Sequence, residues 1–441
     1  MWAPSCVWFL RKKLAAQTGT RCFSFPKTVM ASESLVKRSS LNPANHEVVH
    51  PSYLRYIKVP FYAYSGKDYS LSSKFFMQRY WTAVLQLVPR TMAPNMLTLL
   101  GFCCSCSMTA LVTYFYSVSK QPCPQWVWLF SAVALFGYQT LDAIDGKQAR
   151  RTQSGSALGE LFDHGCDALF TPMLQVVVCL AVGYNDIQRT LHCCGVACGL
   201  FLSIFEQYCT GTLDLGYING PVDGILIICS CLVWTSIAGT SWWTTPFAEP
   251  FVLEAFDVTI ASFTRANDIV FVVCLIGIPV TAFSNLYHVI TMPKAHEKIN
   301  RVAAFFPQVA IFVALAALLS WRELASAWPF AAETAFGMFS SFTVTRLTIS
   351  RLCRSPFRWE SAPAIACLSL AAMSLVTVTL LSLSPATAVD VVGIGCWGTV
   401  IFILVCYVHM MLSVFTQFST HLGVNLLTLT ESQKQVACRV E

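Results

Sequence analysis

The stretch LDAIDGKQARRTQSGSALGELFDHGCDALF, residues 141–170, contains four aspartates at regular intervals. Asp142 and Asp145 are three residues apart, and Asp163 and Asp167 are four residues apart. Side chains at these spacings share one face of an α-helix. We therefore predict two helices joined by a short connection, which brings the two acid pairs face to face.

Apolar runs of about 20 residues, the length of helix that crosses a bilayer, lie on both sides of this stretch. Hydrophobic residues make up 55% of the 441 residues and charged residues only 12%, whereas soluble domains carry about 25% charged residues. This composition excludes a disordered chain, a nucleic-acid-binding protein and a conventional soluble enzyme. Because the runs are continuously apolar rather than alternating, they predict helices.

We therefore predict an all-α, polytopic integral membrane protein with about ten transmembrane helices. The eighth span is the weakest, because Arg346 and Arg351 fall within it. The predicted spans are residues 96–118, 125–144, 161–184, 191–209, 222–244, 268–290, 302–321, 333–353, 363–385 and 390–413.

Basic residues lie mainly in the connections on one side of the predicted membrane. These residues are Lys147, Arg150, Arg151, Lys294, Lys298, Arg301, Arg351, Arg354 and Arg358. Because short cytosolic loops are enriched in Lys and Arg, we predict that this side and both chain termini face the cytosol.

The spans divide the chain into six predicted parts. These are a basic N-terminal tail (1–45), interfacial helices (46–94), a catalytic membrane domain (95–245), a non-cytosolic loop (246–267), a C-terminal transmembrane bundle (268–424) and a cytosolic tail (425–441). We expect the C-terminal bundle to provide lipid access and dimer contacts. The first 32 residues carry basic residues and no acid, which is typical of an unstructured tail or of a mitochondrial-type presequence.

The negative charge of four aspartates near a membrane must be neutralised. One aspartate at the bilayer centre costs roughly 2.5–3.5 kcal/mol on insertion scales, and like charges repel. Divalent cations would neutralise this charge, and hard carboxylate oxygens suit Mg²⁺ or Mn²⁺. The alternative, that these are interface charges flanking two spans, accounts for Lys147, Arg151 and Glu160 but not for aspartates at matched helical spacing.

Other residues of the stretch suit phosphate chemistry. Gly146 and Gly159 leave space for a ligand to approach the backbone. Arg150 offers a planar fork for a phosphate, and Lys147 offers a point charge. His164 can accept a proton from a hydroxyl beside the metal.

The pattern Asp142-x2-Asp145-Gly146-x2-Ala149-Arg150-x8-Gly159-x3-Asp163-x3-Asp167 resembles the signature of the CDP-alcohol phosphotransferase family at every fixed position. LDAIDGKQARRT and LGELFDHGCD are similar to the eukaryotic choline/ethanolamine phosphotransferase branch of that family. The resemblance extends to YSGKDYSLSSK (64–74), APNMLTLLGF (93–102), FEQYCTGTL (205–213) and YVHMMLSVFTQ (407–417).

The resemblance implies an enzyme that transfers phosphocholine or phosphoethanolamine from CDP-choline or CDP-ethanolamine to diacylglycerol or alkyl-acylglycerol and releases CMP. It also implies a homodimer in the endoplasmic reticulum membrane, or in Golgi or mitochondria-associated membrane, with the active site facing the cytosol.

The resemblance also implies roles for the residues of the motif. Asp142, Asp145 and Asp163 would bind metal, and Asp167 would complete the metal site or take the proton. His164 is our preferred general base, with Asp167 as the competitor. The residues expected to line the CDP-alcohol are Gly146, Lys147, Ala149, Arg150 and Gly159.

Two further residues are candidates for substrate binding. Glu206 is expected to hold the positive amine of the alcohol, or to pair with an arginine of the active site. Asn95 can reach the nucleotide, with helix capping as the plainer account.

Three alternatives to this function remain. A transporter would use membrane acids to line an ion path, but here the acids gather at one membrane face. Another CDP-alcohol phosphotransferase would make phosphatidylinositol or phosphatidylglycerol, although such chains are usually shorter and lack the DHGCD context. A single-headgroup enzyme would use only choline or only ethanolamine.

Overall fold

The computed structural model describes residues 48–58, 62, 64–215, 220–255, 258–291, 309–313, 318, 321–358, 361–379 and 384–439. The chain divides into two units, Met1–His46 and Glu47–Glu441, and all the described residues belong to the second unit. The predicted N-terminal tail and most of the predicted span 302–321 lie outside the described residues.

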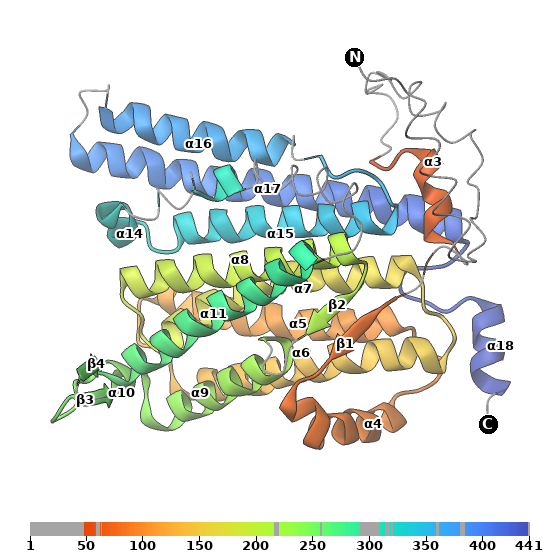
Figure 1. The fold of residues 1–441 in the computed structure, drawn as a ribbon, viewed down its shortest axis with the longest axis horizontal. Coiled ribbons are helices and arrows are strands. Elements are labelled where there is room, and N and C mark those ends of the chain that lie inside the picture. Colours follow the sequence, from red (N-terminus) through yellow and green to blue (C-terminus); the bar gives the residue numbers. More distant parts are fainter. Residues whose placement is uncertain are drawn as a thin grey trace, which may run out of the picture. The chain divides into compact units, whose positions relative to one another are not determined.

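The second unit is a bundle of long helices that run roughly along one direction (Figure 1). These helices are α5 (Pro94–Thr113), α6 (Gln125–Arg151), α7 (Ala157–Ala181), α8 (Asp186–Thr210), α9 (Ile225–Ala238), α11 (Ala266–Thr291), α15 (Ala331–Leu352), α16 (Ala362–Thr379) and α17 (Pro385–Leu422). We call the end of the bundle at which α6 ends and α7 begins the acidic end, and the opposite end the far end.

Short elements connect the long helices. The helical ones are α3 (Pro51–Leu54), η2 (Arg55–Ile57), η3 (Ser73–Met77), α4 (Gln78–Leu87), η4 (Tyr114–Ser119), η5 (Gly220–Gly224), α10 (Thr240–Thr244), α14 (Arg322–Ala327) and α18 (Glu431–Arg439). In the described residues, strands form two pairs. β1 (Gly66–Asp68) is parallel to β2 (Leu213–Leu215), and β3 (Phe251–Ala255) is antiparallel to β4 (Val258–Phe263).

Seven helices in the described part of the chain are long and apolar enough to cross a membrane. They span Pro94–Ser119, Gln125–Arg151, Ala157–Val182, Asp186–Thr210, Gly220–Ala238, Ala266–Thr291 and Pro385–Leu422. These correspond to the first six predicted spans and the tenth. The prediction of an all-α polytopic membrane protein is therefore confirmed.

The predicted eighth span, 333–353, forms α15 and lies in the interior of the bundle. Nearly all of its residues are buried, and it packs against α7, α8 and α17. Its charged side chains are held by partners on neighbouring helices: Glu333 contacts Arg189, and Arg351 contacts Glu160. The low hydropathy of this helix follows from its position, because it faces protein rather than lipid.

The close approach of α7 and α15 depends on a glycine. A Cβ atom at Gly337 would lie 2.7 Å from the Cβ of Pro172, which is inside α7. Because lipid tails are as apolar as the side chains of the bundle, helices in a membrane associate chiefly through such close packing. Phe336 and Phe339, on the same helix, are among the largest fully buried side chains.

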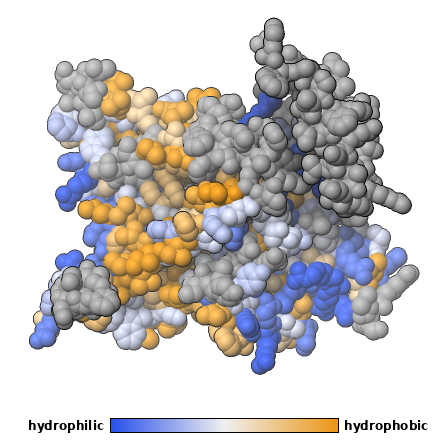
Figure 2. Space-filling model, viewed as in Figure 1, coloured by the Kyte–Doolittle hydropathy of each residue, from blue (hydrophilic) through white to orange (hydrophobic). Residues whose placement is uncertain are grey.

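Apolar side chains cover the middle of the visible face of the molecule, and hydrophilic side chains gather toward the two ends (Figure 2). On α11 the exposed side chains include Val273, Ile276, Val280 and Phe283. This distribution is the one expected of a protein whose middle faces hydrocarbon and whose ends face water.

The hairpin of α6 and α7 was predicted and is present. α6 ends at Arg151, and the side chain of Ser156 caps α7 by accepting the Gly159 N–H at 3.2 Å. The connection is therefore short, and the four aspartates lie at the same end of the bundle.

Candidate metal centre and substrate site

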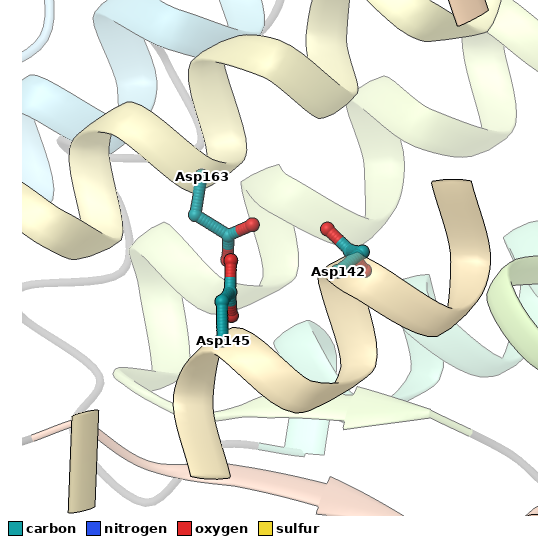
Figure 3. A group of neighbouring side chains, drawn as sticks. All are labelled: Asp142, Asp145 and Asp163. Atoms are coloured by element: carbon teal, nitrogen blue, oxygen red, sulfur yellow. The ribbon is translucent and has the colours of Figure 1, made fainter. Parts of the chain in front are cut away.

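Three of the four aspartates converge between α6 and α7 (Figure 3). One oxygen each from Asp142, Asp145 and Asp163 lies within 4.8 Å of the other two. In Figure 3 the carboxylates of Asp145 and Asp163 point toward each other from the two helices, with Asp142 alongside. The fourth aspartate, Asp167, is outside this group.

The group fits a divalent cation. Asp142 Oδ1 and Asp163 Oδ1 are shielded from solvent and have no hydrogen-bond partner among the described residues. Oxygen ligands of Mg²⁺ lie about 2.1 Å from the ion and those of Ca²⁺ about 2.3–2.6 Å, so two ligands on opposite sides of one ion are about 4–5 Å apart. The three carboxylates therefore have the separation and the unsatisfied oxygens that such an ion requires.

Two hydroxyl groups, one from α5 and one from α6, each donate a hydrogen bond to one of the four aspartates. Thr98 on α5 donates a hydrogen bond to Asp145 Oδ2, and Tyr138 on α6 donates one to Asp167 Oδ1. The Tyr138 ring stacks on Phe170, with 3.8 Å between ring centroids. Sequence analysis missed both hydroxyls. Tyr138 precedes Asp142 by one helical turn, and that spacing is the signal that could have found it.

The predicted nucleotide-binding residues lie along α6 and the start of α7. Gly146 and Ala149 are half-buried and Arg150 is exposed. Lys147 points toward α4, where its Nζ donates to Gln78 Oε1 at 2.9 Å. A Cβ at Gly159 would lie 3.3 Å from Asn95 Oδ1, so the space beside Gly159 is bounded by that carboxamide.

His164 is buried, and its Nδ1 has no hydrogen-bond partner in the described part of the chain. One turn before it on α7, Glu160 forms an ion pair with Arg351 of α15, and the Tyr62 phenol lies near the same carboxylate. Burial and the Glu160 carboxylate raise the pKa of Tyr62, so this phenol stays protonated. Tyr64 behaves alike: burial and the carboxylates of Asp163 and Glu160 raise its pKa.

Asn95 does not cap α5, because Ala93 is the residue at the N-cap and Asn95 lies in the first turn. The capping interpretation is therefore wrong. Instead, Asn95 Nδ2 donates to the main-chain oxygen of Leu426, which follows α17, at 2.9 Å.

Glu206 is 2% exposed, and its Oε1 lies 2.7 Å from His288 Nδ1 of α11. The sequence suggested an amine or an arginine as its partner and did not suggest this histidine. Binding of the alcohol's amine by Glu206 stays a prediction.

A sequence model of the CDP-alcohol phosphatidyltransferase family matches residues 91–211. Choline/ethanolaminephosphotransferase 2 of Arabidopsis thaliana is 31% identical over 382 residues, which cover 84% of this chain and 96% of the relative. Choline/ethanolaminephosphotransferase 1 of Saccharomyces cerevisiae is 30% identical over 68% of this chain and 78% of its own length. Cholinephosphotransferase 1 of Danio rerio is 40% identical over 38% of this chain and 44% of its own length.

The chain belongs to the CDP-alcohol phosphatidyltransferase family. The matched region contains α5 to α8 and therefore all four aspartates, Asn95, His164 and Glu206. Other parts of this family member also reach the acidic end: Arg351 forms an ion pair with Glu160, Tyr62 lies near the same carboxylate, and the main-chain oxygen of Leu426 accepts from Asn95. The acidic end is thus assembled from segments before, within and after the matched region.

Proposed function

We propose that this protein transfers phosphocholine, phosphoethanolamine or both from the CDP-alcohol to a diradylglycerol, forming phosphatidylcholine or phosphatidylethanolamine and CMP. The observation that carries the proposal is the convergence of Asp142, Asp145 and Asp163 within 4.8 Å, in a chain whose relatives are named for this transfer. The single-headgroup activity is the alternative within the same chemistry.

Asp142, Asp145 and Asp163 would hold the divalent cation, and Asp167 would either complete the metal site or take the proton. When bound, the cation, Mg²⁺ or Mn²⁺, neutralises charge on the pyrophosphate and favours attack at phosphorus. Gly146, Ala149, Arg150 and Gly159 would line the CDP moiety, and the exposed Arg150 is suited to phosphate oxygens. Lys147 and Asn95 would lie at the edges of the same site.

In the transfer, the lipid hydroxyl oxygen bonds to the β-phosphorus, and the bond from that phosphorus to the bridging oxygen breaks. CMP leaves with the electron pair. His164 would take the hydroxyl proton on Nδ1, the buried atom that has no partner among the described residues. Asp167 is the competing base, although its Oδ1 already accepts the Tyr138 hydroxyl.

We further propose that the acidic end faces the cytosol, where the nucleotide is supplied, and that the lipid enters sideways from the bilayer. The basic residues in the last turns of α6 and after α15 favour this orientation. The proposed location is the endoplasmic reticulum membrane, with Golgi or mitochondria-associated membrane as alternatives. We propose a homodimer, with residues 95–245 as the catalytic domain and residues 268–424 providing lipid access and dimer contacts.

Purified protein with Mg²⁺ or Mn²⁺, diacylglycerol, and CDP-choline and CDP-ethanolamine in competition tests the proposal directly. We expect phospholipid and CMP in equal amounts, and no product from Asp142→Asn. Product from one donor alone would favour the single-headgroup enzyme. Absence of product from both donors would overturn the proposal, and solute flux into proteoliposomes without CMP release would favour a transporter.

The identity of the base is tested separately by rates measured across pH. We expect His164→Ala to lose most of its turnover, together with the fall in rate at low pH that protonation of the imidazole base causes in the wild-type protein. Asp167→Asn should retain that dependence. Near-normal turnover in His164→Ala would instead assign the proton transfer to Asp167.

A further inference from the structure

The chain that follows α17 is packed against the acidic end. Gly423 ends α17 in the left-handed conformation, with φ of 67°. We call residues 423–430 the C-terminal strap. Its Val424 and Leu426 pack against the main hydrophobic core, and Leu429 is 4% exposed. These apolar contacts fix the strap to the bundle, whereas the sequence predicted a cytosolic tail from residue 425.

The helix that follows the strap is also anchored. Thr430 Oγ1 accepts the Gln433 N–H at 3.4 Å, and Gln433 Oε1 accepts the Thr430 N–H at 2.9 Å, which caps α18. Arg90, before α5, donates to the main-chain oxygen of Ala437 at 3.3 Å. The strap is therefore held at both of its ends.

Asn95 connects the strap to the acid cluster, as we call the group of Asp142, Asp145 and Asp163. Its Nδ2 donates to the Leu426 main-chain oxygen, and its Oδ1 faces Gly159. Thr98, one turn later on α5, bonds Asp145, and Gly159 is one turn before Asp163 on α7. Asn95 is thus linked to two proposed metal ligands, to Asp145 through Thr98 and to Asp163 through the turn of α7 that begins at Gly159.

The Leu426 contact decides which atom of Asn95 is available to a ligand. A main-chain carbonyl oxygen only accepts hydrogen bonds, so it fixes the carboxamide with nitrogen toward the strap. Oδ1 is then the atom beside Gly159, and it is an acceptor. An ionised pyrophosphate offers acceptors alone, whereas the ribose hydroxyls and the amino group of cytosine are donors. Oδ1 therefore suits the nucleoside.

We propose that the C-terminal strap is a positioning element of the nucleotide site: the Leu426 carbonyl orients Asn95 so that Oδ1 accepts a hydrogen bond from the nucleoside of the CDP-alcohol. This inference rests on the proposed function. It predicts that the strap controls affinity for the nucleotide donor and leaves the chemical step unchanged.

The first test compares a chain ending at Gly423, which lacks the carbonyl, with Leu429→Ser, which loosens the strap. Lys434→Ala, which removes a surface ion pair with Glu431 within α18, is the matched control. With saturating diacylglycerol, we expect both strap variants to raise KM for CDP-choline up to about tenfold, the value of one hydrogen bond, with kcat within twofold. Lys434→Ala should change neither constant. If the shortened chain does not fold, Leu429→Ser decides.

The second test asks whether the strap acts through Asn95. Asn95→Ala should raise KM by a similar factor, and the Leu429→Ser/Asn95→Ala double variant should be no worse than Asn95→Ala alone. Independent multiplication of the two effects, or an unchanged KM in the strap variants, would overturn the inference. The proposed function would survive either result, because it fails only if the wild-type protein makes no product at saturating donor.

The third test separates the three donor groups of the nucleoside. The 2′-deoxy and 3′-deoxy analogues of CDP-choline each remove one ribose hydroxyl, and UDP-choline replaces the cytosine amino group by a carbonyl oxygen. The wild-type protein should discriminate against the analogue that lacks the partner of Oδ1, and Asn95→Ala should lose that discrimination. Unchanged discrimination against all three analogues in Asn95→Ala contradicts the proposal.

Discussion

The Tyr138 hydroxyl on α6 donates a hydrogen bond to Asp167 Oδ1 on α7, across the hairpin that carries the acid cluster. The interaction joins the two helices one turn away from the proposed metal ligand Asp142 and one turn away from Asp163. Stacking of the Tyr138 ring on Phe170 fixes the direction of the hydroxyl. Tyr138 is therefore a positioning residue for the fourth aspartate.

Tyr138→Phe keeps the ring and removes the hydroxyl, so it isolates this hydrogen bond. Hydrogen bonds to charged groups contribute about 1.5–3 kcal/mol, which corresponds to a loss of roughly ten- to hundredfold in kcat if Asp167 must be held for turnover. We expect that loss, together with a higher concentration of Mn²⁺ for half-maximal activity. The thermal unfolding temperature should change little, because the stacking remains.

Tyr116→Phe is the matched control for this variant. Tyr116 lies at the far end, where its ring packs edge-on against Phe330 with centroids 5.8 Å apart. Loss of its hydroxyl should leave both activity and the metal requirement unchanged. Equal losses in the two variants would contradict a specific role for Tyr138.

Without metal, the wild-type protein should be less stable than a variant that lacks one carboxylate of the acid cluster. Two carboxylates within 4.8 Å of each other repel by about 3.5 kcal/mol or more at an effective dielectric constant of about 20. Asp163→Asn removes one of three such charges, so without metal it should unfold at a higher temperature than the wild-type protein. It should be inactive all the same.

Addition of Mn²⁺ reverses that order of stability. A ligand present at a hundred times its Kd stabilises the folded state by about 2.7 kcal/mol, so the wild-type protein should gain thermal stability and Asp163→Asn should gain little. Asp390→Asn is the matched control. The Asp390 carboxylate accepts a hydrogen bond from Trp328 Nε1 at the far end, so this variant should respond to Mn²⁺ as the wild type does. An equal Mn²⁺ shift in Asp163→Asn would show that the ion binds elsewhere.

The features that sequence analysis predicted correctly depend on neighbours in the chain. The α6–α7 hairpin follows from two helical spacings and a short connection, and both are local. The features that it missed depend on contacts between distant segments. The parallel pairing of β1 with β2 brings Gly66 opposite Leu213, and nothing in either segment alone specifies the other.

The strap shows a second reason why sequence patterns are incomplete. Asn95 bonds to the main-chain oxygen of Leu426, and every residue has such an oxygen, so no side chain marks the contact. α15 shows a third reason. Arg351 made the predicted span look weak, yet its partner Glu160 lies on another helix, where hydropathy along the chain does not reveal it.

Gly337→Ala tests the close contact between α7 and α15. The added Cβ would lie 2.7 Å from the rigid ring of Pro172, so the helices must separate, at a cost of about 1–3 kcal/mol. Because α7 carries Asp163, we expect lower thermal stability and lower activity. Gly398→Ala on α17 meets no atom within 4 Å, so it should leave activity unchanged and stability equal or slightly higher. A stable Gly337→Ala would contradict the packing argument.

The two buried ion pairs of α15 should differ in their effect on catalysis. At the far end, Arg189 Nε lies 2.8 Å from Glu333 Oε1, and at the acidic end Arg351 pairs with Glu160. Removal of one partner from a buried pair costs about 3–5 kcal/mol, because the other charge is left uncompensated. Glu333→Gln and Glu160→Gln should therefore both lower the thermal unfolding temperature.

Activity per folded molecule distinguishes the two variants. Glu333 lies at the opposite end of the bundle from the acid cluster, so Glu333→Gln should keep the wild-type kcat and KM. Glu160 is one turn before His164, so Glu160→Gln leaves the Arg351 charge without its partner beside the proposed base and should lower kcat at least tenfold. Turnover measured below both unfolding temperatures and normalised to the folded fraction is the required measurement. Equal kcat values in the two variants would mean that the acidic-end pair only stabilises the fold.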